Sequence, residues 1–90
     1  MAVAFIMDFE GGTLDQYDQV MEKMDLGDSV PDNAHFHWAA ETDGGVRVVD
    51  VWESDEAFQA FAEEKIGPYT AEVGLSEPVI ERFEVHNHLS

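Results

Sequence analysis

This chain of 90 residues lacks cysteine, has few basic side chains and has no long apolar run. Without cysteine, neither a disulfide nor a thiolate-bound metal can stabilise the fold. No apolar run approaches the roughly 20 residues of a membrane-spanning helix. The first residues carry no basic region and run directly into a strand pattern, so we expect no signal peptide and a cytoplasmic protein. The order Ser-His-Asp, a phosphate-binding loop and a cysteine nucleophile are also missing.

Basic residues number four against 20 acidic ones, which leaves a formal net charge of −16. We therefore expect neither a nucleic acid nor an anionic membrane as a partner, because no basic patch can replace phosphate counterions. The acidic residues are spread along the chain. This spread predicts a solvated acidic shell of the halophilic kind, in which high salt screens self-repulsion. An ordinary acidic mesophilic protein is the alternative.

The length and the 44% apolar content predict one globular domain over residues 1–90. Apolar, β-branched and aromatic runs predict strands over residues 3–9, 34–41, 46–53 and 79–86. Helical stripes predict two helices between them. Thr13 and Ser54 are the expected N-caps, the first with Gln16 at the capping-box spacing, and Gly27 and Gly67 are the expected ends. Residues 69–75 could form one further helical turn.

The order β-α-β-β-α-β predicts an α+β, ferredoxin-like fold. Right-handed crossovers place both helices on one face of a four-stranded antiparallel sheet. The other face is then bare, and a bare face must be polar or be covered. A domain this small is marginally stable alone, so we expect a second copy of the chain to cover it.

The hairpin connection at residues 42–45 predicts the register, with Glu41 opposite Val46, His37 opposite Asp50 and His35 opposite Trp52. Cross-strand partners share a face. We expect the apolar set under the helices, namely Phe36, Trp38, Val49 and Val51, with Val3, Phe5, Met7, Phe9, Phe83 and Val85 from the first and last strands. The bare face then carries His35, His37, Ala39, Val48, Asp50 and Trp52, with Ala4, Ile6, Asp8, Ile80, Arg82, Glu84 and His86.

This bare face is half apolar and half polar, which is typical of a ligand pocket. Candidate catalytic residues are His37 and Asp50, and the candidate pocket residues are His35, Trp52, His86, Ile6 and Val48. A carboxylate beside an imidazole fixes its tautomer and raises its basicity, so the pair could take a proton from a phenol or an enol. A structural hydrogen-bonded pair in a dimer core is the alternative.

Two His-x-His pairs, at residues 35–37 and 86–88, could present rings on one face of a strand for a metal ion. Their strands are opposite edges of the sheet, so we predict no metal site within one chain and leave open a site across a dimer. Arg47 and Arg82 could each pair with a substrate carboxylate, but neighbouring acids are the more common partners. Arg47 is expected on the helix side.

Residues 51–58, Val-Trp-Glu-Ser-Asp-Glu-Ala-Phe, close the third strand and open the second helix. With the βαββαβ pattern, they resemble the dimeric α/β-barrel superfamily, which includes antibiotic-biosynthesis-monooxygenase-like and heme-degrading-monooxygenase-like domains. The resemblance is greatest to small members of unassigned function that share the segments at residues 36–37, 44–54 and 85–87. It implies a homodimer formed sheet to sheet, with a pocket between sheet and helices or inside the barrel.

The heme-degrading members use an Asn, a Trp and a His, of which Trp52 alone has a counterpart here, because Ala4 and Ala62 fall at the other two positions. Heme degradation is therefore not implied, and we expect no cofactor. The sequence leaves two functions open. One is a cofactor-free monooxygenase-like enzyme acting on a small aromatic or enolic molecule, and the other is a non-catalytic ligand-binding or structural dimeric module.

Overall fold

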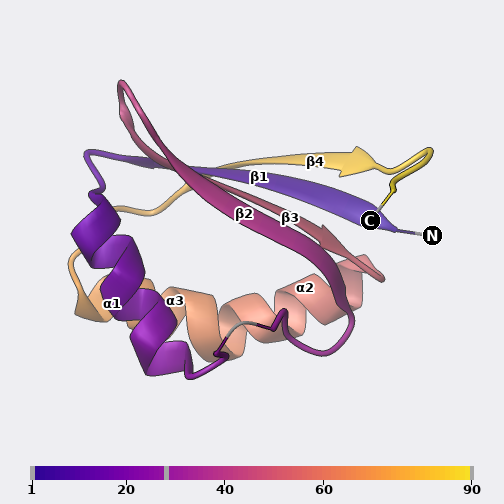
Figure 1. Cartoon of the computed structure of the whole chain (residues 1–90), viewed down its shortest axis with the longest axis horizontal. Coiled ribbons are helices and arrows are strands. Elements are labelled where there is room, and N and C mark those ends of the chain that lie inside the picture. Colours follow the sequence, from indigo (N-terminus) through magenta and orange to yellow (C-terminus); the bar gives the residue numbers. More distant parts are fainter. Residues whose placement is uncertain (1, 28, 90) are drawn as a thin grey trace.

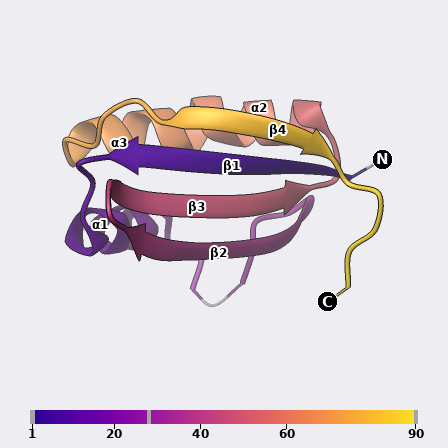
Figure 2. The ribbon, with the colours of Figure 1, turned by 90° about the horizontal axis from the view of Figure 1, so that it is seen from above.

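The computed structural model describes residues 2–27 and 29–89 (Figure 1). Its elements are β1 (Val3–Glu10), α1 (Leu14–Met24), β2 (Ala34–Thr42), β3 (Gly45–Trp52), α2 (Asp55–Phe61), the π-helix η1 (Ala62–Ile66), α3 (Gly67–Glu72) and β4 (Val79–Glu84). The four strands form one antiparallel sheet in the order β2-β3-β1-β4. The α1 helix and the continuous helix α2–η1–α3 lie on the same face of the sheet (Figures 1 and 2). The predicted α+β, ferredoxin-like fold is confirmed.

Both helix starts follow the prediction. The Thr13 hydroxyl accepts a hydrogen bond from the Gln16 N–H at 3.2 Å, and the Gln16 side chain accepts one from the Thr13 N–H at 3.0 Å. Ser54 caps α2 by accepting from the Ala57 N–H at 3.2 Å. These side chains satisfy backbone donors that a helix leaves unpaired in its first turn.

The predicted helix ends were wrong. The α1 helix is capped by Asp25, which takes up a left-handed conformation at φ 56°, two residues before Gly27. The second helix does not stop at Gly67 but continues from α2 through η1 into α3. Pro68 has no N–H to donate to a helical hydrogen bond. The π-helix precedes it, and the Gly67 N–H donates to the Ala62 carbonyl five residues back, so that the helix continues to Pro68. The last strand also ends two residues earlier than predicted, at Glu84.

The predicted hairpin register is confirmed from Glu41 opposite Val46 through His37 opposite Asp50. An irregularity follows, so that Ala34 rather than His35 lies opposite Trp52. At the turn, an added Cβ on Gly45 would stand 2.1 Å from the Phe9 carbonyl oxygen, which explains the glycine at this position.

The predicted faces of β2, β3 and β4 were inverted. Trp52 and Asp50, expected on the bare face, are 2% and 5% exposed beneath the helices. Phe36 and Trp38, expected in the core, are each 41% exposed. On β4, Phe83 is on the bare face, whereas Ile80, Arg82 and Glu84 are on the helix side, because they pair with Met7, Phe5 and Val3 of β1.

Pairing with β1 explains this inversion. The inward set of β1, Val3 to Phe9 at every second residue, is buried as predicted. Val3 lies opposite Trp52 and Phe5 opposite Asp50, so these β3 residues must share the inward face. Phe58 of α2 stacks on Phe5 at 3.8 Å between ring centroids and closes the core from the helix side.

In the described part of the chain, no helix is long and apolar enough to cross a membrane. The cytoplasmic location expected from the first residues stays a prediction.

Candidate functional site

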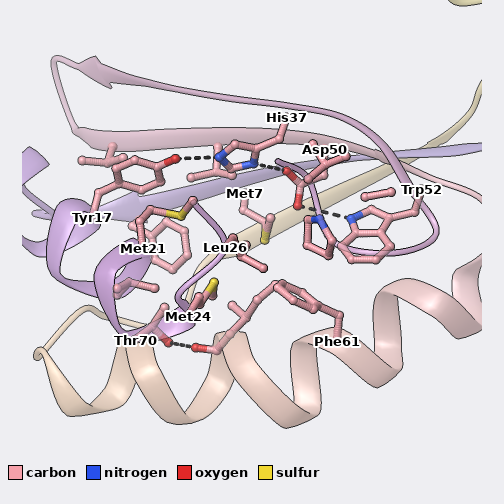
Figure 3. Close-up of a pocket in the computed structure, with 18 of the residues that line it drawn as sticks. Met7, Tyr17, Met21, Met24, Leu26, His37, Asp50, Trp52, Phe61 and Thr70 are labelled. Carbon is pink, nitrogen blue, oxygen red and sulfur yellow. Dashed lines mark hydrogen bonds and ion pairs between the residues drawn. The ribbon is translucent and has the colours of Figure 1, made fainter. Parts of the chain in front are cut away.

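A cavity of about 220 Å³ lies between the sheet and the helices of a single chain (Figure 3). The register had placed the pocket on the opposite face, and the cavity corrects that expectation; the resemblance to the dimeric α/β barrels had also allowed a pocket between sheet and helices, where this cavity lies. Its walls are mainly apolar and come from β1, β3, α1, the connection after α1, and the α2–η1–α3 helix. They include Met7, Val48, Met21, Met24, Leu26, Phe61 and Ile66.

Four side chains form a continuous chain of hydrogen bonds along the sheet side of the cavity. The Tyr17 hydroxyl is 2.6 Å from His37 Nε2. His37 Nδ1 is 2.5 Å from Asp50 Oδ1, and the Trp52 indole N–H donates to Asp50 Oδ2 at 3.3 Å. Figure 3 shows them in line, from α1 across β2 to the end of β3.

With His37 as the neutral imidazole, the donors and acceptors of the network assign its hydrogens. An indole N–H can only donate, so the Asp50 carboxylate accepts from Trp52, and it accepts from His37 Nδ1–H with its other oxygen. The neutral imidazole then has its lone pair on Nε2, which accepts from the Tyr17 hydroxyl. Both nitrogens of His37 are therefore occupied. Hydrogen bonds to a charged group contribute about 1.5–3 kcal/mol each, so Asp50 holds the ring firmly.

The electrostatics of Tyr17 agree with this assignment. Burial raises the pKa of its phenol above the usual value, and the negative charges of Asp50 and Asp18 raise it further. The hydroxyl therefore keeps its hydrogen at neutral pH and donates it to His37. Tyr17 also packs nearly parallel to the His37 ring, with 6.0 Å between the ring centroids.

Local structure positions each member. His37 and Asp50 are direct cross-strand partners on β2 and β3, so their side chains share a face. Tyr17 is in the first turns of α1, whose start is set by the capping box at Thr13. The π turn precedes Thr70, whose hydroxyl donates to the Ile66 carbonyl at 2.7 Å and so turns toward its own helix.

Among the residues predicted for the site, His37, Asp50, Trp52 and Val48 line the cavity. The others lie elsewhere. Ile6 alternates to the bare face, and His86 is exposed after the end of β4. His35, in the irregular part of β2, is exposed and stacks on His88 at 5.5 Å between ring centroids.

Tyr17 was not predicted as a site residue, because its helical spacing with Leu14 and Val20 assigns it to the apolar stripe of α1. One signal was available: its phenol hydroxyl needs a hydrogen-bond partner when buried. That partner could not be identified while His37 was assigned to the wrong face.

The stacking of His35 on His88 brings the two His-x-His segments together within one chain, which we had expected only across a dimer. The segment after β4 runs past the ends of the strands toward the β2 side of the sheet (Figure 2). Among residues 2–27 and 29–89, no group of three or more histidine, cysteine, aspartate or glutamate side chains has a metal-binding arrangement.

Both arginines pair with acids outside the cavity. Arg47 binds Asp8 through two bonds of 2.7 and 3.1 Å. It lies on the bare face rather than on the predicted helix side, because Asp8 is its partner across β1 and β3. Arg82 binds Asp55 at the start of α2 through two bonds of 2.7 Å. Neither arginine is placed to bind a carboxylate in the cavity.

Comparisons with known proteins support the fold. No family model matches the chain, and no curated protein matches it in sequence. The solved structures include one with the same fold, a candidate antibiotic biosynthesis monooxygenase from Deinococcus radiodurans. The two share 10% sequence identity at a TM-score of 0.61, and the match covers 100% of this chain and 97% of the other. At this identity, the similarity shows the ferredoxin-like fold that the sequence motifs predicted.

Proposed function

We propose that this chain is a cofactor-free, monooxygenase-like enzyme acting on a small aromatic or enolic molecule. One observation carries the proposal: a carboxylate-supported imidazole, His37 with Asp50, in the wall of an otherwise apolar cavity of about 220 Å³. Small-molecule sites combine apolar walls with a few convergent polar groups in this way. The fold of the Deinococcus radiodurans protein is consistent with the proposal.

The chemistry requires a base and no bound redox group. Withdrawal of a proton from a phenol or an enol toward His37 leaves an electron-rich anion, and Asp50 stabilises the imidazolium. The anion reacts with dioxygen, the co-reactant. One oxygen atom enters the substrate as a carbonyl, and the other leaves as water with two substrate hydrogens, one from the hydroxyl and one from the carbon that is oxidised. The substrate itself is therefore the reductant.

A non-catalytic ligand-binding or structural module is the second candidate, and a specific observation favours it. Both nitrogens of His37 are already hydrogen-bonded, and both Asp50 oxygens accept bonds. Fully satisfied polar networks also occur where the sole requirement is a well-specified core.

The replacement His37→Ala separates the two candidates. If His37 is the base, the rate of dioxygen consumption with small phenols and enols should be about 10²- to 10⁴-fold lower in the variant. The measurement is oxygen uptake with a panel of such compounds, together with ligand titration. The matched control is His86→Ala, because His86 is an exposed histidine outside the cavity. Unchanged oxygen uptake and ligand binding in a folded His37→Ala protein would contradict a catalytic His37.

The proposal includes a homodimer formed through the bare face of the sheet. Cross-strand pairing places Phe36, Val51, Ala4 and Phe83 in one row across all four strands. Trp38, Val49 and Ile6 form most of the next row. Within these rows, Phe36, Trp38 and Phe83 are 41%, 41% and 50% exposed, whereas Val51 is 8% exposed. Exposed aromatic side chains gathered on one face are typical of an interaction site. The resemblance to the dimeric α/β barrels supports a second copy of the chain as the partner.

The proposal also includes adaptation to high salt. Three of the four basic side chains, Lys23, Arg47 and Arg82, form ion pairs, which leaves most of the 20 acidic residues uncompensated. Raising KCl from about 0.01 M to 1 M shortens the screening length from about 30 Å to about 3 Å.

We expect thermal unfolding in KCl to show at least about 1 kcal/mol of stabilisation between these concentrations, or about 4–8 °C in Tm. Sucrose at matched osmolality is the control, because it stabilises by exclusion from the surface without screening charge. A Tm that does not rise in KCl, or that rises equally in sucrose, refutes the salt adaptation.

A further inference from the structure

The hydrogen bonds of His37 leave it no free nitrogen to offer to a ligand. Nδ1 is bound to Asp50, and Nε2 is bound to the Tyr17 hydroxyl at 2.6 Å. Tyr17 lines the same cavity and reaches it from α1, on the side opposite to Asp50 (Figure 3). A hydroxyl that donates its hydrogen keeps lone pairs with which it accepts a bond. The polar atom that is open to a ligand next to the base is therefore the Tyr17 oxygen.

The charges around the cavity restrict what can bind. Neither lysine nor arginine appears among the described residues that line it, and Lys23, Arg47 and Arg82 pair with acids elsewhere. Asp50 contributes a buried negative charge to the wall. A carboxylate or phosphate ligand would lose its hydration next to a like charge, with no cation to replace the water. A hydroxyl group has no such cost, because it can donate to the Tyr17 oxygen.

The volume restricts the ligand further. An apolar protein cavity of roughly 150 Å³ is large enough to bind benzene. The present cavity, of about 220 Å³, therefore accommodates one aromatic ring with small substituents.

We propose that the cavity selects a neutral, single-ring molecule with a hydroxyl group, and that Tyr17 is the residue that touches this hydroxyl and passes its proton to His37. This inference rests on the proposed function, since it assigns the ligand and the first proton acceptor of the same site.

The proton path balances in two linked transfers. The ligand hydroxyl gives its proton to the Tyr17 oxygen while Tyr17 gives its own proton to His37 Nε2. Tyr17 is neutral before and after, the ligand becomes its anion, and His37 becomes an imidazolium held by Asp50. Without ionising, Tyr17 acts as a relay, which agrees with its raised pKa.

The test compares three probes with the same ring: phenol, toluene and benzoate. Binding is followed by titrating the backbone and Trp52 indole N–H resonances in ¹H–¹⁵N spectra. In the unmodified protein, we expect phenol to bind about tenfold more tightly than toluene, the ratio that one net hydrogen bond produces. Benzoate should bind at least about tenfold more weakly than phenol, because its charge loses hydration beside Asp50. This comparison needs no variant and is therefore independent of any folding defect.

The replacement Tyr17→Phe keeps the ring and removes the hydroxyl. Phenol affinity should fall about tenfold, to that of toluene, whereas toluene affinity should not change. A merely structural role for Tyr17 would lower both affinities together. Tyr69→Phe is the matched control, because Tyr69 belongs to α3 and does not line the cavity.

The outcomes separate this inference from the proposed function. Phenol that binds and depends on His37 but not on Tyr17 would overturn the relay and leave the base in place. Benzoate that binds as tightly as phenol would overturn the selection of neutral ligands, but not the relay or the proposed function. Failure of all three probes to perturb the cavity resonances would overturn both this inference and the proposed small-molecule site.

Discussion

Trp52→Ala is expected to lower the free energy of unfolding by about 3–5 kcal/mol, the cost of removing a large aromatic side chain from a core. Trp52 is 2% exposed, and its ring forms a T-shaped pair with Phe58 and packs against Phe61, with 6.0 and 5.1 Å between ring centroids. The variant would also leave Asp50 Oδ2 without the indole N–H that it accepts. Small domains have only about 5–15 kcal/mol of stability in total, so this is a large fraction.

Urea unfolding followed by far-UV circular dichroism measures this effect. Trp38→Ala is the matched control, since Trp38 is 41% exposed on the bare face and should lose much less at protein concentrations where the chain is monomeric. Equal losses in the two variants would contradict the burial of Trp52. Should Trp52→Ala fail to fold, Trp52→Phe keeps most of the ring and should lose about 1–3 kcal/mol, largely by removing the N–H.

Phe83→Glu is expected to raise the dissociation constant of the proposed homodimer more than about 100-fold. Phe83 lies on β4 in the apolar row across the bare face and is 50% exposed in the single chain. Burying an unpaired carboxylate between two such faces costs several kcal/mol, and each 1.4 kcal/mol is a factor of ten in affinity. The partner face would also present its own excess of negative charge.

Sedimentation velocity over a series of protein concentrations in high KCl measures the change. Leu14→Glu is the matched control, since Leu14 is similarly exposed at the start of α1 but belongs to the helix layer. It adds the same charge and should leave the dimer intact. A monomeric starting protein, or equal dissociation of both variants, would refute dimerisation through the sheet.

These experiments have consequences for the site as well. We had expected the pocket to depend on the dimer, with His37 and Asp50 between two sheets. Because the cavity lies inside one chain, Phe83→Glu should leave phenol binding unchanged even where it dissociates the dimer. The proposed dimerisation and the proposed ligand binding can therefore be tested separately.

The parts of the site that could be predicted are those that depend on residues close together in the sequence. The turn at residues 42–45 was sufficient to pair His37 with Asp50, because hairpin register depends on loop length and cross-strand compatibility. The cap at Thr13 was equally local. The proximity of Tyr17 to His37 was not predictable in this way. It depends on how α1 packs on the sheet, which no residue near Tyr17 in sequence reveals.

The assignment of the two sheet faces shows the limit most clearly. Their apolar character predicted Phe36 and Trp38 under the helices, which left His37 and Asp50 for the bare face. The structure reverses this, because Tyr17 and Trp52 satisfy the polar pair internally, and a satisfied hydrogen-bonded network can be buried without large cost. The apolar pair is left on a face that a second chain can cover.

By itself, then, the sequence determined the order of elements, the helix starts, the hairpin register and the excess of negative charge. Each depends on residues within a few positions of one another or on composition. Tertiary structure decided which face of the hairpin meets the helices, where the cavity lies and which hydroxyl forms the hydrogen bond with His37 Nε2. A strand alternates with a period of two and is compatible with either face; the pairing of β3 with the inward residues of β1 selects between them.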